Sequence, residues 1–278
     1  MLEAPLVFIP LPKERVWGGR RLEERFGKSL PPGVPIGESW EICDRPDDQS
    51  VVADGPLAGA SLPKTEMWYF AEADPGAGIY VGFEPGVTRQ AFTGRLDDGT
   101  VAGCFRRIPT RAGDAMFLPS GRAHALGAGN LVFEIQQNSD TTYRVFDWNR
   151  TGLDGKPREL HREPALESID FSDTHPERIP EFWSRVAPGV VSRPLVRHAL
   201  FAVDLWRFRP GAGAGATVAA GQGPVVLGGV SGTVRVQVGD RHRVLSPGRF
   251  LLIPAAVAGR LRVDAVDASE ILRVADGS

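Results

Sequence analysis

Glycine and proline interrupt this chain so often that few stretches are long enough for an extended helix. The 278 residues include 33 glycines and 23 prolines, and both residue types disfavour the interior of a helix. Between them lie short apolar runs such as residues 78–83, 115–118 and 131–136. Short strands separated by turn signals are typical of β-barrels and β-sandwiches. The sequence therefore predicts a mainly β protein.

The same pattern extends along the chain and suggests two halves. We predict strands at residues 38–42, 50–53, 67–71, 78–83, 115–118, 131–136, 201–208, 224–227, 233–238, 249–253 and 260–263. Residues 158–169 have helical composition and are the one clear helix that we expect. The predicted domains are residues 1–175, an N-terminal arm and barrel, and residues 196–278, a second barrel. Residues 176–195 are the predicted linker.

An internal repeat relates the two halves. The segment GDAMFLP from Gly113 to Pro119 is echoed by GRFLLIP from Gly248 to Pro254, with the same spacing from glycine to proline. The first copy continues to His124, and the second has Gly259 at the corresponding position. Self-similarity of this kind indicates repeated units. We expect two related jelly-roll barrels, the first with a ligand histidine and the second without metal ligands.

Charge and cysteine content exclude several functional classes. The formal net charge is −2, which is unlike the basic footprint of a nucleic-acid-binding protein. No apolar stretch is long enough to span a membrane, and the N-terminus does not resemble a signal peptide. Cys43 and Cys104 form no paired motif, which favours a reducing compartment. We expect a cytoplasmic protein that is a monomer or a weak homo-oligomer and binds neither nucleic acid nor membranes.

His124 ends a pattern that suits a metal site. A predicted strand stops at Pro119, Gly121 allows a tight turn, and His124 begins the next strand. A neutral imidazole that faces a polar cavity can bind zinc, iron or manganese, although a lone histidine after such a turn is more often structural. The pattern from Gly113 to His124 resembles the second signature motif of the cupin superfamily. The paired histidines of the first cupin motif, which an iron oxygenase would use, are missing.

Longer segments resemble one enzyme family. The segments KTEMWY at residues 64–69, GRAHALGAG at 121–129 and EIQQNSDTTYRVFD at 134–147 resemble signature segments of type I mannose-6-phosphate isomerases in their short bacterial form. The segments RVWGG at 15–19, IGESWE at 36–41 and GPLAG at 55–59 are similar to that family too. The resemblance covers residues from 5 to about 170, and the C-terminal barrel matches only in general character.

The resemblance implies a reaction, a metal and six site residues. The implied activity is the zinc-dependent interconversion of mannose 6-phosphate and fructose 6-phosphate, an aldose–ketose isomerisation of a small sugar phosphate. It implies zinc ligands Glu66 and His124, substrate-binding residues Lys64 and Trp17, and catalytic residues Arg144 and Asp140.

The chemistry explains these residue types. Moving a proton between adjacent sugar carbons passes through an enediolate, whose negative charge needs preorganised positive partners. A divalent metal can polarise the sugar oxygens, and Arg144 can stabilise the charge or hold the phosphate. The sequence leaves the base open among Asp140, Glu41 and a metal-bound water. Ordinary structural roles are also open: Asp140 as a turn residue, Arg144 as an outward-facing arginine.

One departure from the family pattern affects the metal site. Family members carry a segment with a Gln-x-His-Pro motif that supplies two further zinc ligands, whereas here Leu62 is followed directly by Pro63 and Lys64, and no Gln-x-His pair occurs. Catalytic zinc usually has three protein ligands, so two ligands predict weaker binding and impaired activity. The alternative function is therefore a non-catalytic sugar-phosphate-binding cupin that has lost its metal.

Overall fold

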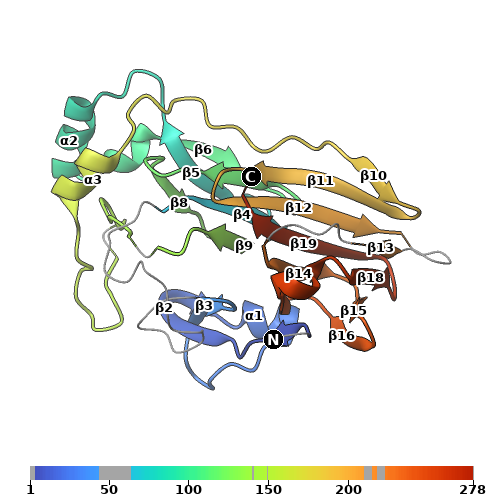
Figure 1. Ribbon diagram of the computed structural model, residues 1–278. Coiled ribbons are helices and arrows are strands. Elements are labelled where there is room, and N and C mark those ends of the chain that lie inside the picture. The colour runs from blue at the N-terminus through green and yellow to red at the C-terminus, as the bar shows by residue number, and fades with distance from the viewer. Residues whose placement is uncertain are drawn as a thin grey trace. The chain divides into compact units, whose positions relative to one another are not determined.

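The computed structural model describes residues 4–43, 64–139, 141–148, 150–209, 215–217 and 223–277 (Figure 1). The chain divides into two compact units. Unit 1 combines Met1–Gly55 with Pro180–Ser278, and unit 2 is Pro56–Ile179. The N-terminal arm therefore belongs to the same unit as the C-terminal strands. The mainly β fold class predicted from the sequence is confirmed.

Unit 2 is built from two antiparallel sheets that face each other. Its described strands form the sheets β7-β4-β9 and β6-β5-β8. The strands are β4 (Glu66–Ala73), β5 (Gly78–Phe83), β6 (Phe105–Pro109), β7 (Ala115–Leu118), β8 (His124–Leu126) and β9 (Asn130–Gln136). Phe70 and Met116 from the first sheet cluster with Ile79 and Val81 from the second. Since this one cluster contains side chains from both sheets, the apolar core lies between the two sheets.

Helices cover one end of unit 2. These are α2 (Arg89–Asp97), the 3-10 turn η1 (Val101–Cys104) and α3 (Arg162–Ser168). Phe92 of α2 and Leu166 of α3 belong to one buried cluster with Phe83 of β5, and α2 and α3 lie together in Figure 1. Helix α3 lies within the predicted segment 158–169, whereas α2 was not predicted.

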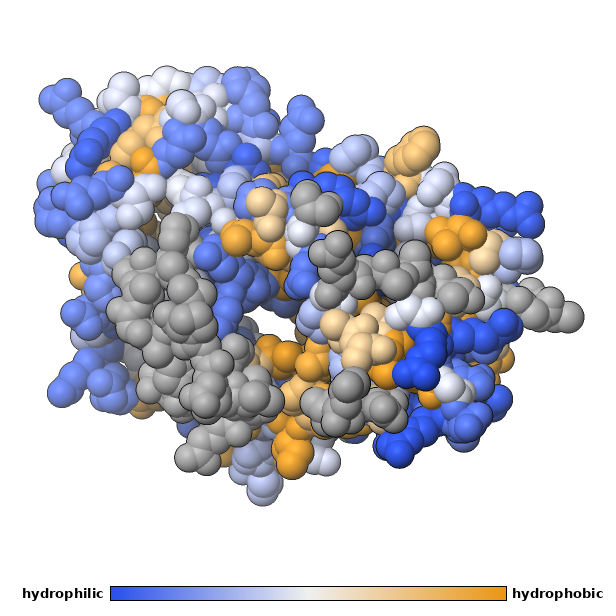
Figure 2. All heavy atoms as spheres, viewed as in Figure 1, coloured by the Kyte–Doolittle hydropathy of each residue, from blue (hydrophilic) through white to orange (hydrophobic). Residues whose placement is uncertain are grey.

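Unit 1 holds a larger β-structure. Apart from a two-stranded sheet in the N-terminal arm, its described strands form a seven-stranded sheet, β1-β17-β14-β19-β12-β11-β10, and a four-stranded sheet, β13-β18-β15-β16. The bounds are β1 (Leu6–Val7), β10 (Ser184–Ala187), β11 (Val190–Arg197), β12 (Phe201–Phe208), β13 (Gly215–Thr217), β14 (Val225–Ser231), β15 (Val234–Val238), β16 (Arg241–Leu245), β17 (Phe250–Ile253), β18 (Leu261–Ala265) and β19 (Ser269–Asp276). Side chains from both sheets share one core. Hydrophilic residues cover the part of the visible face formed by β15 and β16 (Figure 2), where Arg241, His242 and Arg243 are exposed.

The N-terminal arm is joined to the C-terminal strands by backbone pairing and a buried charge. The arm contains β1, β2 (Leu11–Gly19), α1 (Arg21–Phe26) and β3 (Ile36–Trp40). Strand β1 pairs antiparallel with β17. Lys28 donates to the Gly248 carbonyl oxygen at 2.7 Å and to Glu41 Oε1 at 2.6 Å. Gly248 has a φ of +71°, and an added Cβ there would lie 2.5 Å from Phe26, so only glycine fits.

The structure adds detail to several sequence predictions. The segment 176–195, expected as a linker, contains β10 and most of β11. Val190 and Leu195 are buried there, and β11 pairs with β12. The two compact units do not test the predicted domain ranges 1–175 and 196–278, which stay a prediction. The predicted strand 50–53 lies outside the described residues. No helix in the described part of the chain is long and apolar enough to cross a membrane.

The internal repeat corresponds to two strands that each follow a glycine with a positive φ angle. Gly113 and Gly248 both have positive φ angles, 89° and 71°, and precede β7 and β17 respectively. After β7 the chain turns through Gly121 to His124, whereas after β17 it enters the short helix α4 (Ala255–Ala258). The second copy therefore replaces the turn that presents the histidine with a helical turn.

Candidate functional site

A buried carboxylate lies at the start of β4. Glu66 is 1% exposed and stands two residues before Trp68, so both side chains project from the same face of the strand. A buried carboxylate needs charged or hydrogen-bonding partners. Lys64 provides one, through an ion pair with Glu66 Oε2. His124 provides the other, with Nε2 2.6 Å from Glu66 Oε1.

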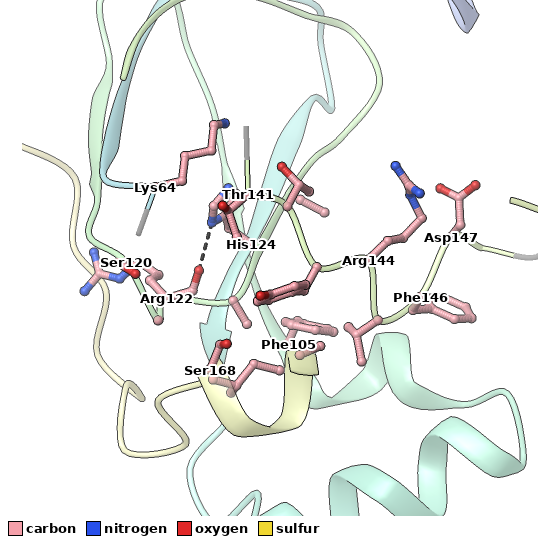
Figure 3. Close-up of a pocket in the computed structure, with 18 of the residues that line it drawn as sticks. Lys64, Phe105, Ser120, Arg122, His124, Thr141, Arg144, Phe146, Asp147 and Ser168 are labelled. Carbon is pink, nitrogen blue, oxygen red and sulfur yellow. Dashed lines mark hydrogen bonds between the residues drawn. The ribbon is translucent and has the colours of Figure 1, made fainter. Parts of the chain in front are cut away.

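The turn before β8 aims His124 at this carboxylate. Gly121 has a φ of +91°, a conformation that favours glycine. The Nδ1 atom of His124 lies 2.8 Å from the Arg122 carbonyl oxygen, shown dashed in Figure 3. A carbonyl only accepts, so Nδ1 carries the hydrogen and Nε2 is directed at Glu66. Trp68 packs at right angles to the imidazole, with ring centroids 5.1 Å apart.

Glu134 on β9 completes the charged cluster. It lies opposite Trp68 in the strand register and accepts hydrogen bonds from Trp68 Nε1 at 3.2 Å and from Lys64 Nζ at 2.9 Å. Lys64 thus bridges two carboxylates. Glu134 is not among the six residues implied by the family resemblance, although its position between the apolar residues Phe133 and Ile135 is a sequence signal that it faces the cavity.

Mutual interaction shifts the pKa of each cluster member. Burial alone would raise the pKa of Glu66, but the hydrogen bond and charge of His124, with the charge of Lys64, hold it well below its usual range. Burial would lower the pKa of His124 and of Lys64, but the carboxylates beside them raise both. Burial and the charge of Glu66 raise the pKa of Glu134 to about 7, although 35% of its side chain is exposed.

The cluster opens into a pocket of about 490 Å³ that lies entirely within unit 2. Lys64, Glu66 and His124 line it together with residues 141–148 and Arg150. Figure 3 shows Lys64 and His124 on one side of the pocket, and Arg144 and Asp147 on the other. The Arg144 guanidinium donates to the Glu159 carbonyl oxygen at 3.1 Å. The pocket therefore combines the anionic and imidazole cluster with arginine on its opposite wall.

The structure brings together most of the predicted site residues. Glu66, His124 and Lys64 are in direct contact, and Arg144 lines the same pocket. Trp17 belongs to unit 1, where it is 45% exposed on β2. Asp140 lies outside the described residues. The functional roles of all six stay predictions.

The donors in the cluster suit a divalent cation, but the set is small. Glu66 and His124 present a carboxylate oxygen and an imidazole nitrogen to each other, which are both zinc donors. The Arg122 carbonyl orients the imidazole from behind, as partners of metal-binding histidines usually do. In the described ranges no group of three or more histidine, cysteine, aspartate or glutamate side chains could hold a metal ion.

The known proteins that are similar in sequence to this chain include two with the name mannose-6-phosphate isomerase. No protein-family model matches the chain. The chain is 32% identical over 228 residues to the "Probable mannose-6-phosphate isomerase GmuF" of Bacillus subtilis, covering 64% of this chain and 72% of GmuF. It is 30% identical over 257 residues to the mannose-6-phosphate isomerase ManA of the same organism, covering 74% of this chain and 80% of ManA. Those 257 positions exceed the residues that 74% of this chain supplies, so ManA has residues without a counterpart here.

Solved structures agree with the sequence relatives. The crystal structure of the mannose 6-phosphate isomerase from Bacillus subtilis matches with a TM-score of 0.85 and 26% identity, covering 98% of this chain and 99% of that chain. A mannose 6-phosphate isomerase bound with zinc and yttrium matches with a TM-score of 0.69 and 12% identity, over 99% and 100% of the two chains. The second match shows a shared fold.

Proposed function

The chain belongs to the mannose-6-phosphate isomerase family, and from this premise we propose that it interconverts mannose 6-phosphate and fructose 6-phosphate with zinc held by Glu66 and His124. One observation carries the proposal. The Glu66 carboxylate and His124 Nε2 lie 2.6 Å apart in a pocket that is also lined by Arg144. An acid, an imidazole and a guanidinium that are distant in sequence thus share one cavity of suitable size for a small ligand.

The cluster fits zinc through its donor chemistry. A carboxylate and an imidazole whose tautomer is fixed are typical zinc ligands, and zinc is bound in a solved structure with the same fold. Zinc bound there would polarise the carbonyl and hydroxyl oxygens of an open-chain sugar. Glu134, the third carboxylate or imidazole group of the cluster, is a further oxygen donor within the described residues.

The remaining residues suit the proton transfer and the anion. Glu134 has a pKa raised to about 7, and a general base works best when its pKa is near the operating pH. Lys64 links Glu134 to Glu66 and would stabilise negative charge on the enediolate. Arg144, on the opposite wall, would hold the phosphate or the developing charge. We retain Asp140 as a catalytic residue and Trp17 as a substrate-binding residue within this proposal.

A specific contact favours a second candidate, a non-catalytic sugar-phosphate-binding protein. Lys64 Nζ bridges Glu66 and Glu134, so an ammonium neutralises these carboxylates beside the position where a cation is expected. The described residues also provide no three-residue metal group. A site neutralised in this way could bind sugar phosphate through Lys64 and Arg144 without a metal.

The compartment and the assembly state belong to the proposal as well. Cys43 and Cys104 are not joined by a disulfide, which suits a reducing cytoplasm. We propose a cytoplasmic enzyme of sugar metabolism that acts as a monomer or weak homo-oligomer.

A coupled assay distinguishes the two candidates. Formation of fructose 6-phosphate from mannose 6-phosphate is followed with protein stripped of metal by a chelator and then reloaded with zinc. The isomerase proposal expects turnover that disappears on stripping and returns with zinc. Binding of mannose 6-phosphate by calorimetry without any zinc-dependent turnover above a zinc-only blank rejects the isomerase and supports the binding protein.

A further inference from the structure

Trp148 has an unusual backbone conformation at the edge of the pocket. Among the residues that the structure describes, it is the non-glycine residue with a positive φ, at 51°. A bulky side chain rarely adopts this conformation, which persists only where the surroundings hold it. Strained residues of this kind concentrate at ligand-binding sites.

A closed turn holds Trp148 in place. The Arg150 amide donates to the Asp147 carbonyl oxygen at 3.0 Å, and Arg150 Nη2 pairs with Asp147 Oδ1 at 2.6 Å. Arg158 approaches the same carboxylate oxygen at 3.4 Å. The Asp147 side chain is only 9% exposed, whereas that of Arg150 is 43% exposed, so the carboxylate end of this ion pair is shielded from water.

Two aromatic rings and the Arg150 guanidinium, whose Cζ atom lies 5.8 Å from the ring centroid, contact the indole without burying it. Tyr80 lies 5.5 Å from it with an interplanar angle of 52°, and Phe146 lies 5.3 Å from it at 48°. Trp148 nevertheless remains 37% exposed and lines the pocket with His124 and Arg144. A tryptophan needed only for packing would be expected to be more completely buried and in relaxed backbone. The turn instead keeps a large aromatic surface available in the pocket.

We propose that Trp148 is a specificity-determining residue, the platform on which the carbon chain of the sugar phosphate lies. The C–H groups of a sugar form an apolar face that packs on an aromatic ring, while charged groups such as Arg144 take its phosphate. This division matches an apolar wall with a few placed polar groups, as small-molecule sites require. The inference rests on the proposed function, since it assumes a sugar phosphate in this pocket.

Calorimetry with two ligands tests the platform. Dissociation constants for mannose 6-phosphate and for inorganic phosphate are measured on the full chain and on Trp148→Gly and Trp148→Phe. Glycine adopts a positive φ freely, so Trp148→Gly removes the ring without adding backbone strain. We expect Trp148→Gly to weaken mannose 6-phosphate binding about tenfold and to leave phosphate binding unchanged, and Trp148→Phe to be intermediate. Trp183→Ala, in unit 1, is the matched control and should behave as the unchanged chain.

Each outcome decides the matter. Equal affinity of Trp148→Gly and the unchanged chain for mannose 6-phosphate overturns the platform, and so does an equal loss for both ligands, which would mean that the turn only positions charged groups. If the unchanged chain binds mannose 6-phosphate without turnover, the isomerase proposal fails, while the dissociation constants of the Trp148 variants still test the platform. If the unchanged chain does not bind mannose 6-phosphate at all, both proposals fail.

Discussion

In the charged cluster, the pKa of each side chain depends on the neighbours that it contacts. Glu66 and Glu134 both come close to Lys64, yet the pKa of Glu66 is lowered while that of Glu134 is raised to about 7. The difference arises because His124 bonds to Glu66, and the charge of Glu66 then acts on Glu134. The motifs around Glu66 and His124 could be read from the sequence, but this asymmetry depends on strand register and burial, which no local pattern contains.

The cluster predicts how metal-depleted protein responds to pH. The folded chain keeps the Glu134 proton up to about pH 7, whereas a glutamate of ordinary pKa, 4.5, has lost it. Stability therefore falls as pH rises from about 4.5 to about 7. The raised pKa of His124 extends the fall above pH 6.5. With a chelator present, we expect the melting temperature to fall from pH 5 to pH 8. In Glu134→Gln, the melting temperature should fall less between pH 5 and pH 7.

An exposed glutamate provides the control for this pH profile. Glu167 lies on the surface of α3, and Glu167→Gln should keep the slope of the unchanged chain. Equal slopes for Glu134→Gln and the unchanged chain would show that Glu134 does not hold its proton in the folded state.

Whole strands were more predictable than helices. The predicted runs 78–83, 115–118 and 201–208 coincide with β5, β7 and β12, because short apolar runs bounded by turn residues point to strands. Helix α2 was not predicted. Its sequence, RQAFTGRLD, has few apolar residues, and its stability comes from Phe92 and Leu96, which pack against residues such as Phe83. That contact is tertiary and leaves little periodic pattern in the sequence.

The start of α2 provides a test at the level of one element. The Thr88 hydroxyl accepts a hydrogen bond from the Ala91 amide at 3.1 Å and so caps the helix. Thr88→Ala should lower the free energy of unfolding by about 1 kcal/mol, and Thr88→Ser should retain most of it. Urea denaturation measures both variants. An alanine variant as stable as the unchanged chain would mean that α2 is held by packing alone.

At the scale of the whole molecule, one of the two compact units combines segments from both ends of the sequence. The arm that carries β2 and β3 belongs with the C-terminal strands. A local pattern could not predict this pairing, because it depends on contacts between Lys28 and Gly248, 220 residues apart. Lys28 is 6% exposed and depends on Glu41 for its counter-charge. Burial lowers the pKa of Lys28, although the bond to Glu41 opposes this.

The buried pair predicts a large effect on stability. Lys28→Met leaves the Glu41 carboxylate without its ammonium and should lower the free energy of unfolding by about 3–5 kcal/mol. The double variant Lys28→Met with Glu41→Gln removes both charges and should recover part of the loss. Urea denaturation of the unchanged chain, the two single variants and the double variant measures the coupling. A single variant with unchanged stability would contradict the role given to this pair.

The most direct test of the site is the zinc content of purified protein after equilibration with zinc and removal of excess metal. A zinc site at Glu66 and His124 predicts stoichiometric zinc in the unchanged chain and in His242→Ala, whose histidine is exposed on β16. It predicts little zinc in Glu66→Gln and His124→Ala. An unchanged chain that retains no zinc, or variants that retain as much as the unchanged chain, would contradict a shared cation site at Glu66 and His124.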